Sequence, residues 1–257
     1  MDQTEQTPTR TSDDDVCPQC KGVEWIFTVQ EGISTAKRCE CFAKRLSAKV
    51  VPHANIPSKY ALCSFDNFNI NDPHPAASDS LSKAFNIAQA YFRQFPTLSD
   101  PRGLLISGLN GIGKTHLAVA AFRRILEKGI EGRFINYQGL LELIRSGYDK
   151  SFGESRTQKY VEIEHVPLLL IDDLGANRVT DWVEDTVTHL ISFRHDHQLP
   201  TIVTTNYSPY PSETRYLADR IGERATSRLR EMCKIINMPN VADKRGTNPH
   251  SRFAPLG

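Results

Sequence analysis

The stretch Gly108-Leu109-Asn110-Gly111-Ile112-Gly113-Lys114-Thr115 decides the fold. It matches the pattern G-x-x-x-x-G-K-[ST], a loop whose backbone N–H groups and following helix N-terminus surround phosphate groups. The apolar run at 104–107 predicts a buried strand before the loop, and 116–122 predicts a helix after it. The alternative is a glycine-rich turn with a chance lysine. The flanking strand and helix favour the phosphate-binding loop.

We expect this loop to bind ATP. Lys114 is placed to neutralise the β- and γ-phosphates, and the Thr115 hydroxyl is placed to hold Mg²⁺. Glycines let the backbone approach the phosphates closely. The predicted nucleotide-binding residues of the loop are Gly108, Asn110, Gly111, Ile112, Gly113, Lys114, Thr115 and His116.

A second apolar run, 166–171, ends in Asp172 and Asp173. A strand that is apolar without alternation suits a parallel sheet covered on both faces. Asp172 is predicted to coordinate Mg²⁺ at the strand tip. Asp173 is predicted to orient or deprotonate the attacking water. Many ATPases of this type have Glu there, and the shorter Asp predicts slow hydrolysis. The alternative is a chance Asp-Asp turn.

Asn206 ends the predicted strand 201–206. In a parallel sheet that tip lies beside the γ-phosphate, where an amide can position water, although helix capping is a competing role. Further strands are predicted at 133–137 and 234–236. Helices are predicted at 80–94, 138–148, 181–198 and 213–231, while 149–165 is polar. Strands that alternate with helices predict a three-layer α/β domain with a parallel sheet.

Three arginines, Arg220, Arg224 and Arg228, lie four positions apart in the last predicted helix and are therefore expected to share a face. One of them is a candidate arginine finger that stabilises charge on a neighbour's ATP. Such a role requires head-to-tail assembly into a ring or spiral, and so predicts an ATP-dependent homo-oligomer. The alternative is a solvated basic face paired with nearby glutamates.

Four cysteines, Cys17, Cys20, Cys39 and Cys41, flank a predicted hairpin with a turn near 31–32. Two close thiol pairs brought together by a hairpin predict a tetrahedral zinc site, which would stabilise a module too small to fold on its core alone. The second pair is C-x-C, which weakens the pattern, and the alternative is four free thiols. The remaining predictions concern His53 as a spare ligand, and Cys63 and Cys233 as small buried hydrophobes.

These segments predict the following organisation: a disordered tail at 1–15, a zinc-binding module at 16–46, a linker at 47–62, an ATPase domain at 63–238 and a flexible tail at 239–257. The chain has 257 residues, 24% charged residues and a net charge of +1, so any nucleic-acid binding has to be local. No apolar run reaches about 18 residues, which predicts no membrane span. The polar first residues predict no signal peptide, and hence a cytoplasmic protein.

The chain resembles AAA+ ATPases of the initiator/loader clade, and within it bacterial replicative helicase loaders of the DnaC/DnaI type. Besides the phosphate loop, the similarity lies in 64–68, in 168–175 and in 222–229, where Arg228 falls in the finger position and Asn206 at the sensor position. The resemblance implies that Phe65 and Phe68 lie near the adenine. It also implies that the Cys-rich module engages the replicative helicase.

The resemblance further implies that 138–160 is a single-strand-binding element. Arg145, Lys150, Phe152, Lys159 and Tyr160 offer it charge and stacking surfaces, although an ordinary solvated loop fits equally well. A C-terminal lid is absent or minimal after Met238, and the weak candidates for a second sensor are Lys244 and Arg245.

The leading hypothesis is an ATP-dependent helicase loader that binds single-stranded DNA and hydrolyses ATP slowly, with stimulation by its partners. The alternatives are an IstB-type transposition helper and a zinc-ribbon adaptor whose nucleotide-bound core is a scaffold. A helical N-terminus is expected for the transposition helper, whereas Lys114, Thr115, Asp172 and Asn206 argue against a scaffold.

Overall fold

The computed structural model describes residues 16–30, 33–97, 103–148, 154–177, 180–211 and 215–239. The predictions for 1–15, for the turn at 31–32 and for nearly all of 239–257 lie outside this range. The same holds for the named residues Lys150, Phe152, Lys244 and Arg245.

Five parallel strands form the central sheet, which confirms the predicted α/β class. They are β3 (Gly103–Ser107), β4 (Gly132–Asn136), β5 (Leu168–Leu174), β6 (Thr201–Thr205) and β7 (Cys233–Asn237). Their order in the sheet is β4-β5-β6-β3-β7. The carboxyl ends of β3, β5 and β6 therefore lie next to one another, and these are the ends that carry the phosphate loop, the two acids and Asn206.

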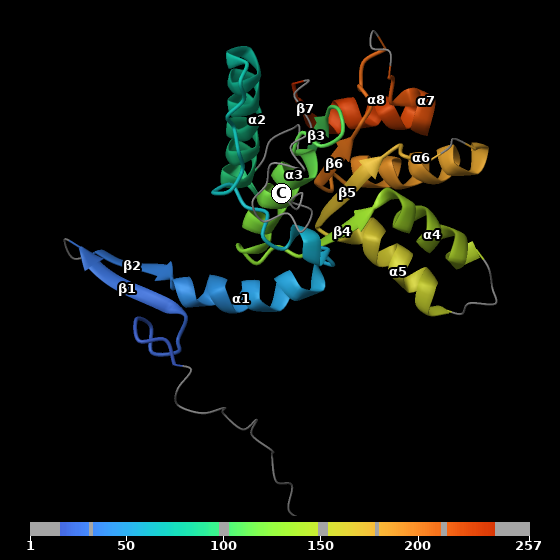
Figure 1. Ribbon diagram of the computed structural model, residues 1–257. Helices are drawn as coiled ribbons and strands as arrows, with labels where there is room; N and C mark the ends of the chain where they lie inside the picture. The colour runs from blue at the N-terminus through green and yellow to red at the C-terminus, as the bar shows by residue number, and fades with distance from the viewer. Residues whose placement is uncertain are drawn as a thin grey trace, which may run out of the picture.

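Helices cover both faces of the sheet and give the predicted three layers (Figure 1). One face carries α2 (Pro75–Gln94), α3 (Lys114–Leu126) and the end of α1 (Glu40–His53). The other carries α4 (Tyr137–Tyr148), α5 (Glu154–His165), α6 (Asp181–Asp196), α7 (Ala218–Ile221) and α8 (Glu223–Met232). Successive strand residues alternate between the two cores, because a strand has a two-residue period; Leu104 and Ile106 face α3 while Leu105 faces the other layer.

Helix α5 occupies most of the segment that the sequence marked only as polar. Its C-terminal end is held by a distant residue, the fully buried Arg194 of α6. The Arg194 guanidinium donates to the carbonyl oxygens of Glu164 and Val166, each at 3.0 Å, and to Pro200 at 2.7 Å. Burial lowers the pKa of Arg194 to about 9. These contacts satisfy helix-end carbonyls that local sequence leaves open, so α5 depends on packing rather than on an amphipathic pattern.

The single helix predicted over 213–231 is wrong. Within the described residues, this region contains a bridge between Ser208 and Tyr216 and two helices, α7 and α8. They are separated by Gly222, whose φ of +84° is a conformation that glycine adopts without strain. Arg220 therefore lies on α7, whereas Arg224 and Arg228 lie on α8. The predicted common face of the three arginines does not exist.

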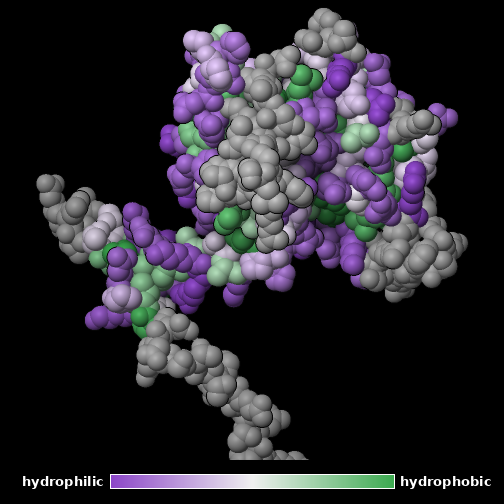
Figure 2. Space-filling view, viewed as in Figure 1, coloured by the Kyte–Doolittle hydropathy of each residue, from purple (hydrophilic) through white to green (hydrophobic). Residues whose placement is uncertain are grey.

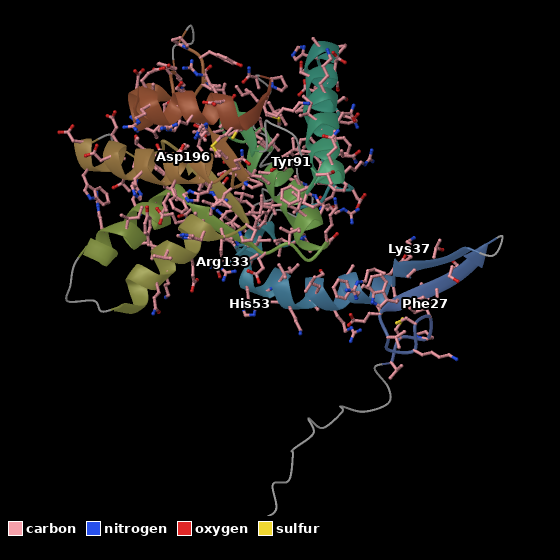
Figure 3. All side chains as sticks on the ribbon, turned by 180° about the vertical axis from the view of Figure 1, so that it is seen from behind. Phe27, Lys37, His53, Tyr91, Arg133 and Asp196 are labelled. Carbon is pink, nitrogen blue, oxygen red and sulfur yellow. The ribbon has the colours of Figure 1, made fainter. Side chains whose placement is uncertain are left out.

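The hairpin between the two cysteine pairs is confirmed as β1 (Trp25–Gln30) and β2 (Ile33–Arg38), paired antiparallel. It projects from the α/β core at the far end of α1 (Figure 1). Figure 2 shows hydrophobic residues at its surface, where Val23 is 60% and Phe27 70% exposed. Figure 3 shows Phe27 and Lys37 on opposite sides of the ribbon, as alternation along the strands requires.

Helix α1 joins the hairpin to the core and runs without interruption across the proposed boundary between 46 and 47. A Cβ on Gly129, just after α3, would lie only 2.0 Å from Leu46 of α1, so the two helices are in close contact there. The carbonyl of Ala54, just after α1, accepts a 2.7 Å hydrogen bond from the N–H of Phe134 in the edge strand β4. In the part of the chain that the structure describes, no helix is both long and apolar enough to cross a membrane.

Candidate functional site

The phosphate loop connects β3 to α3, as predicted. Gly108 and Gly113 have φ values of +147° and +98°, which side-chain-bearing residues rarely adopt. A Cβ on Gly108 would lie 2.5 Å from Ile112 Cδ1, so the loop also needs glycine for space. Gly113 ends the loop directly before α3, whose first N–H groups are therefore directed into the loop.

Lys114 reaches across the loop to the tip of β6. Its side chain is 5% exposed, and Nζ donates to the carbonyl of Leu109 and to Oδ1 of Asn206, each at 2.7 Å. Asn206 follows β6 directly. Lys114 and Asn206, which were each predicted to lie at the phosphates, are therefore in direct contact, although they are 92 positions apart.

Thr115 and Asp172 meet at the same edge of the sheet. The Thr115 hydroxyl donates to Asp172 Oδ1 at 2.8 Å, and the hydroxyl of Thr204 donates to the same oxygen at 2.6 Å. Asp172 is 3% exposed, and this burial raises the pKa of its carboxyl group. A hydroxyl and a carboxylate are the oxygen ligands that Mg²⁺ prefers, so these residues fit the predicted metal role.

Asp173 projects differently from its neighbour. Its φ is +58°, its side chain is exposed, and the pairing of β5 with β6 is shifted between Ile171 and Leu174. This bulge interrupts the alternation of the strand, so that Asp172 is buried while Asp173 reaches solvent at the same edge. An exposed carboxylate beside a metal ligand suits the predicted contact with water.

Of the two phenylalanines expected near the adenine, only Phe68 lies at the phosphate loop. A Cβ on Gly113 would meet the Phe68 ring at 3.0 Å, and the Phe68 ring lies 5.4 Å from the ring of His116. Phe65 is 5% exposed and packs against Phe85 and Phe92 of α2, centroids 5.4 and 5.2 Å apart, so it belongs to the core.

His116, on α3, contacts the segment that precedes α2. Its Nε2 lies 2.9 Å from the carbonyl of Ser64 and 2.9 Å from Oδ1 of Asn67. Desolvation lowers the pKa of His116, which favours the neutral ring.

Sequence reasoning missed a short turn whose residues interact electrostatically with Asp172. Ser58–Tyr60 forms one turn of 3-10 helix. Burial raises the pKa of Asp172, and the charge of Lys59 opposes part of this rise. Burial together with the Asp172 charge raises the pKa of Tyr60. No local signal marks this turn, because Lys59 lies far before the phosphate loop in the sequence. The sequence pattern likewise identifies Thr204 only as part of a strand and does not predict its contact with Asp172.

The arginines of α7 and α8 have different environments. Arg220 donates to the carbonyl of Gly175 at 2.8 Å and to that of Asn177, so it braces the segment after β5. Arg228 contacts the end of α6, with Nη1 3.4 Å from Nδ1 of His195 and 3.8 Å from a carboxylate oxygen of Asp196. Among the described residues the Nε of Arg228 has no hydrogen-bond partner. Its contacts are with α6 and not with its own phosphate loop.

The four predicted zinc ligands come together at the base of the hairpin. The sulfurs of Cys17 and Cys39 are 3.7 Å apart, those of Cys20 and Cys41 are 3.3 Å apart, and all four lie within 4.8 Å of one another. Tetrahedral zinc with bonds of 2.3 Å places sulfurs about 3.8 Å apart, so the set fits Zn²⁺. His53 lies at the opposite end of α1 (Figure 3), and its suggested role as a spare ligand is wrong.

The spacing of the second pair has a structural reason. Cys39 is the N-cap of α1 and Cys41 lies in its first turn, so a helix N-terminus replaces the second C-x-x-C turn. Backbone N–H groups lower the pKa of Cys17 to about 6, whereas the neighbouring thiol of Cys20 is the largest cause that raises the pKa of Cys41 to about 12. A bound cation would be needed for all four sulfurs to be thiolates at once, because the neighbouring thiols oppose the loss of the proton from Cys41. Outside this cluster Cys233 is buried, as predicted, but Cys63 is only half-buried.

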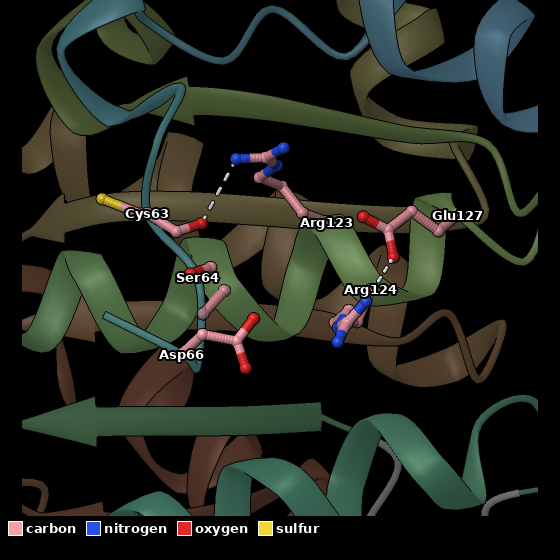
Figure 4. Close-up of a pocket in the computed structure, with 7 residues that line it drawn as sticks. Cys63, Ser64, Asp66, Arg123, Arg124 and Glu127 are labelled. Carbon is pink, nitrogen blue, oxygen red and sulfur yellow. Dashed lines mark hydrogen bonds and ion pairs between the residues drawn. The ribbon is translucent and has the colours of Figure 1, made fainter. Parts of the chain in front are cut away.

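A pocket of about 150 Å³ lies beside α3 but away from the phosphate loop (Figure 4). It is lined by Cys63, Ser64, Asp66, Ala120, Arg123, Arg124 and Glu127. Its cations are already engaged, since Arg123 donates to the carbonyls of Ala61 and Cys63 and Arg124 pairs with Glu127 at 3.1 Å. The contacts of Arg123 hold the segment before the core against α3. None of the predicted phosphate ligands lines the pocket.

Comparison with known proteins identifies the family of the central domain. Residues 92–243, more than half of the chain, match the family of IstB-like ATP binding proteins. The uncharacterized protein YqaM of Bacillus subtilis is 25% identical over 227 residues, covering 85% of this chain and 66% of YqaM. The replicative helicase loader DnaI of Bacillus subtilis is 25% identical over 162 residues, covering 63% of this chain and 49% of DnaI. The chain thus spans about half to two thirds of the length of these relatives.

Among solved structures, the crystal structure of the DnaC helicase loader is 29% identical to this chain, with a TM-score of 0.60. The match covers 71% of this chain and 100% of that one.

Proposed function

Because the chain belongs to the family of IstB-like ATP binding proteins, we propose that it is an ATP-hydrolysing helicase loader that binds a replicative helicase and single-stranded DNA. The observation that carries the ATPase part is the joint arrangement of Lys114 with Asn206 and of Thr115 with Asp172. The loader part is supported by the similarity to DnaI and DnaC, both of which are helicase loaders. A zinc module that projects from the core offers a docking element separate from the nucleotide site.

The contacts of Lys114 suggest how ATP acts as a switch. Nζ bonds the Asn206 amide oxygen in this structure, and the phosphates of ATP are a stronger partner for the ammonium group. When Lys114 turns to the phosphates, Asn206 is released to hold the attacking water, and Asp173 accepts a proton from that water. Thr115 and Asp172 would hold Mg²⁺, which supplies positive charge to the phosphates.

A transposition helper is the second candidate, because the matched family is described as IstB-like. The four-cysteine module argues for the loader, since a helical N-terminus is expected for the helper. The scaffold alternative predicts that function survives the loss of ATP hydrolysis.

The first prediction concerns the helicase partner. The full chain is expected to co-purify with the replicative helicase of its host in the presence of ATP, and to a different extent without nucleotide, because ATP controls assembly. The measurement is affinity capture of the purified helicase in both nucleotide states, with a DNA-free sample as control. If the helicase is not retained in either state, the loader proposal is wrong and the transposition helper takes its place.

The second prediction concerns Arg228 as a finger that acts on a neighbouring subunit. Arg228→Ala is expected to lower ATP hydrolysis roughly 100-fold or more while ATP binding persists, because the finger stabilises charge only in the transition state. Mixing Arg228→Ala with Lys114→Ala should restore part of the activity, since one subunit supplies the loop and the other the arginine. Arg224→Ala, on the same helix and exposed, is the matched control. A mixture no more active than its components would mean that Arg228 only stabilises the contact with α6, through His195 and Asp196.

A further inference from the structure

One hydroxyl group, that of Thr204, connects the two acids of the nucleotide site. Thr204 Oγ1 donates to Asp172 Oδ1 at 2.6 Å and accepts a hydrogen bond from the backbone N–H of Asp173 at 2.9 Å. The Thr204 side chain is completely buried. A hydroxyl group has a single hydrogen to donate, and here Asp172 receives it, so the direction of both bonds is fixed.

This contact lies where the backbone departs from regular strand geometry. The pairing of β5 with β6 is interrupted between Ile171 and Leu174, and Asp173 has a φ of +58°. Without the regular ladder, the N–H of Asp173 needs another acceptor, and Thr204 supplies it. The hydroxyl thus replaces a missing ladder bond at the position from which the Asp173 side chain leaves the sheet.

The second hydroxyl on Asp172 has another task. Thr115 donates to the same oxygen, but Thr115 is also the phosphate-loop residue expected to hold Mg²⁺. A hydroxyl that turns to a metal no longer donates to Asp172 in the same way. Thr204 has no such competing task and is positioned to hold the carboxylate in both states.

We propose that Thr204 is a positioning residue for ATP hydrolysis, which orients Asp172 toward the metal and fixes the backbone that presents Asp173 to water. This inference rests on the proposed ATPase activity. Thr204 lies on β6, two positions before Asn206. It would orient the acids, which neither the phosphate loop nor the acids do by themselves.

The test compares three variants of the full chain. Thr204→Val keeps the shape of the side chain but removes the hydroxyl, and Thr204→Ser keeps the hydroxyl. Thr205→Val is the matched control, because Thr205 is equally buried on the same strand but donates to the carbonyl of Leu174, 2.8 Å away, and to neither carboxylate.

Thr204→Val is expected to lower kcat roughly 10- to 100-fold, the value of a hydrogen bond to a charged group. The KM for Mg²⁺-ATP should rise together with this loss, because Asp172 is no longer held toward the metal, while the phosphate-loop contacts remain. Thr204→Ser and Thr205→Val should both stay within about threefold of the wild-type kcat, a range well below the loss of a bond to a charged group. Calorimetry supplies a second readout: Thr204→Val should weaken ATP binding in Mg²⁺ but leave binding in EDTA unchanged.

The outcomes separate this inference from the proposed function. A wild-type chain without ATPase activity would contradict the proposed function itself. An active wild type with an equally active Thr204→Val variant would overturn the role of Thr204 alone, and so would equal losses in Thr204→Val and Thr205→Val. If Thr204→Val does not fold, Thr204→Ala replaces it, with the same expected loss of kcat and the same loss of Mg²⁺-dependent binding.

Discussion

Lys114→Ala is expected to abolish measurable ATP hydrolysis, with a loss of roughly 100- to 1,000-fold, the range found when a charge-stabilising donor is removed from an active site. Lys114 is the buried cation of the loop, and its Nζ bonds the residue that is expected to position water. Its removal takes away the positive charge that would neutralise the phosphates. It also removes the contact between Asn206 and the phosphate loop.

The measurement is steady-state ATPase activity together with binding of ATP by calorimetry. Arg124→Ala is the matched control, because Arg124 lies on the same helix and pairs only at the surface with Glu127. A Lys114→Ala variant that is inactive in hydrolysis but still captures the helicase and supports loading would favour the adaptor with a nucleotide-bound scaffold over the loader.

The double variant Cys17→Ser/Cys20→Ser is expected to lose its zinc and the fold of the hairpin, while the ATPase core remains folded. Structural zinc contributes about 10–16 kcal/mol of binding free energy in small zinc-dependent peptides, which is folding free energy for a module without a core of its own. The described hairpin exposes Val23 and Phe27 and has little to replace the metal.

Zinc content by atomic absorption and helicase capture should both be lost, whereas ATP hydrolysis should persist. Cys63→Ser is the control, since Cys63 is a thiol of the same chain outside the cluster. Retained helicase capture by a zinc-free chain would show that the partner binds elsewhere. A wild-type protein that contains no zinc after purification without chelators would contradict the metal assignment.

Much of the nucleotide site was predictable because its parts are local in sequence. The phosphate loop, the apolar strand before Asp172 and the strand before Asn206 each carry their own pattern. A parallel sheet then brings the strand ends together without further information. The geometry of Lys114, Thr115, Asp172 and Asn206 follows from that rule.

The parts that the sequence did not predict depend on contacts between distant residues. Helix α5 ends on carbonyl groups satisfied by Arg194, which lies on another helix. The bulge that exposes Asp173 depends on Thr204 of the neighbouring strand. The break at Gly222 is visible as a glycine, but a glycine inside a helical pattern does not by itself predict a positive φ. Phe65 matches a motif and yet packs in the core, because a motif does not specify which way a side chain points.

The continuous helix α1 connects the hairpin to the core through one rigid element. One end of α1 contains Cys41. The middle of the helix contacts Gly129, just after α3, through Leu46, and Ala54, just after its other end, is bonded to the edge strand β4. A helix of 14 residues is about 21 Å long. The half of α1 that precedes Leu46 is about 9 Å long, so a tilt of about 10° at the Leu46 contact would displace the start of the helix by about 1.6 Å. A displacement of α3 would therefore be passed along α1 to the hairpin, because in the described residues the helix runs without a break from Leu46 to Cys41.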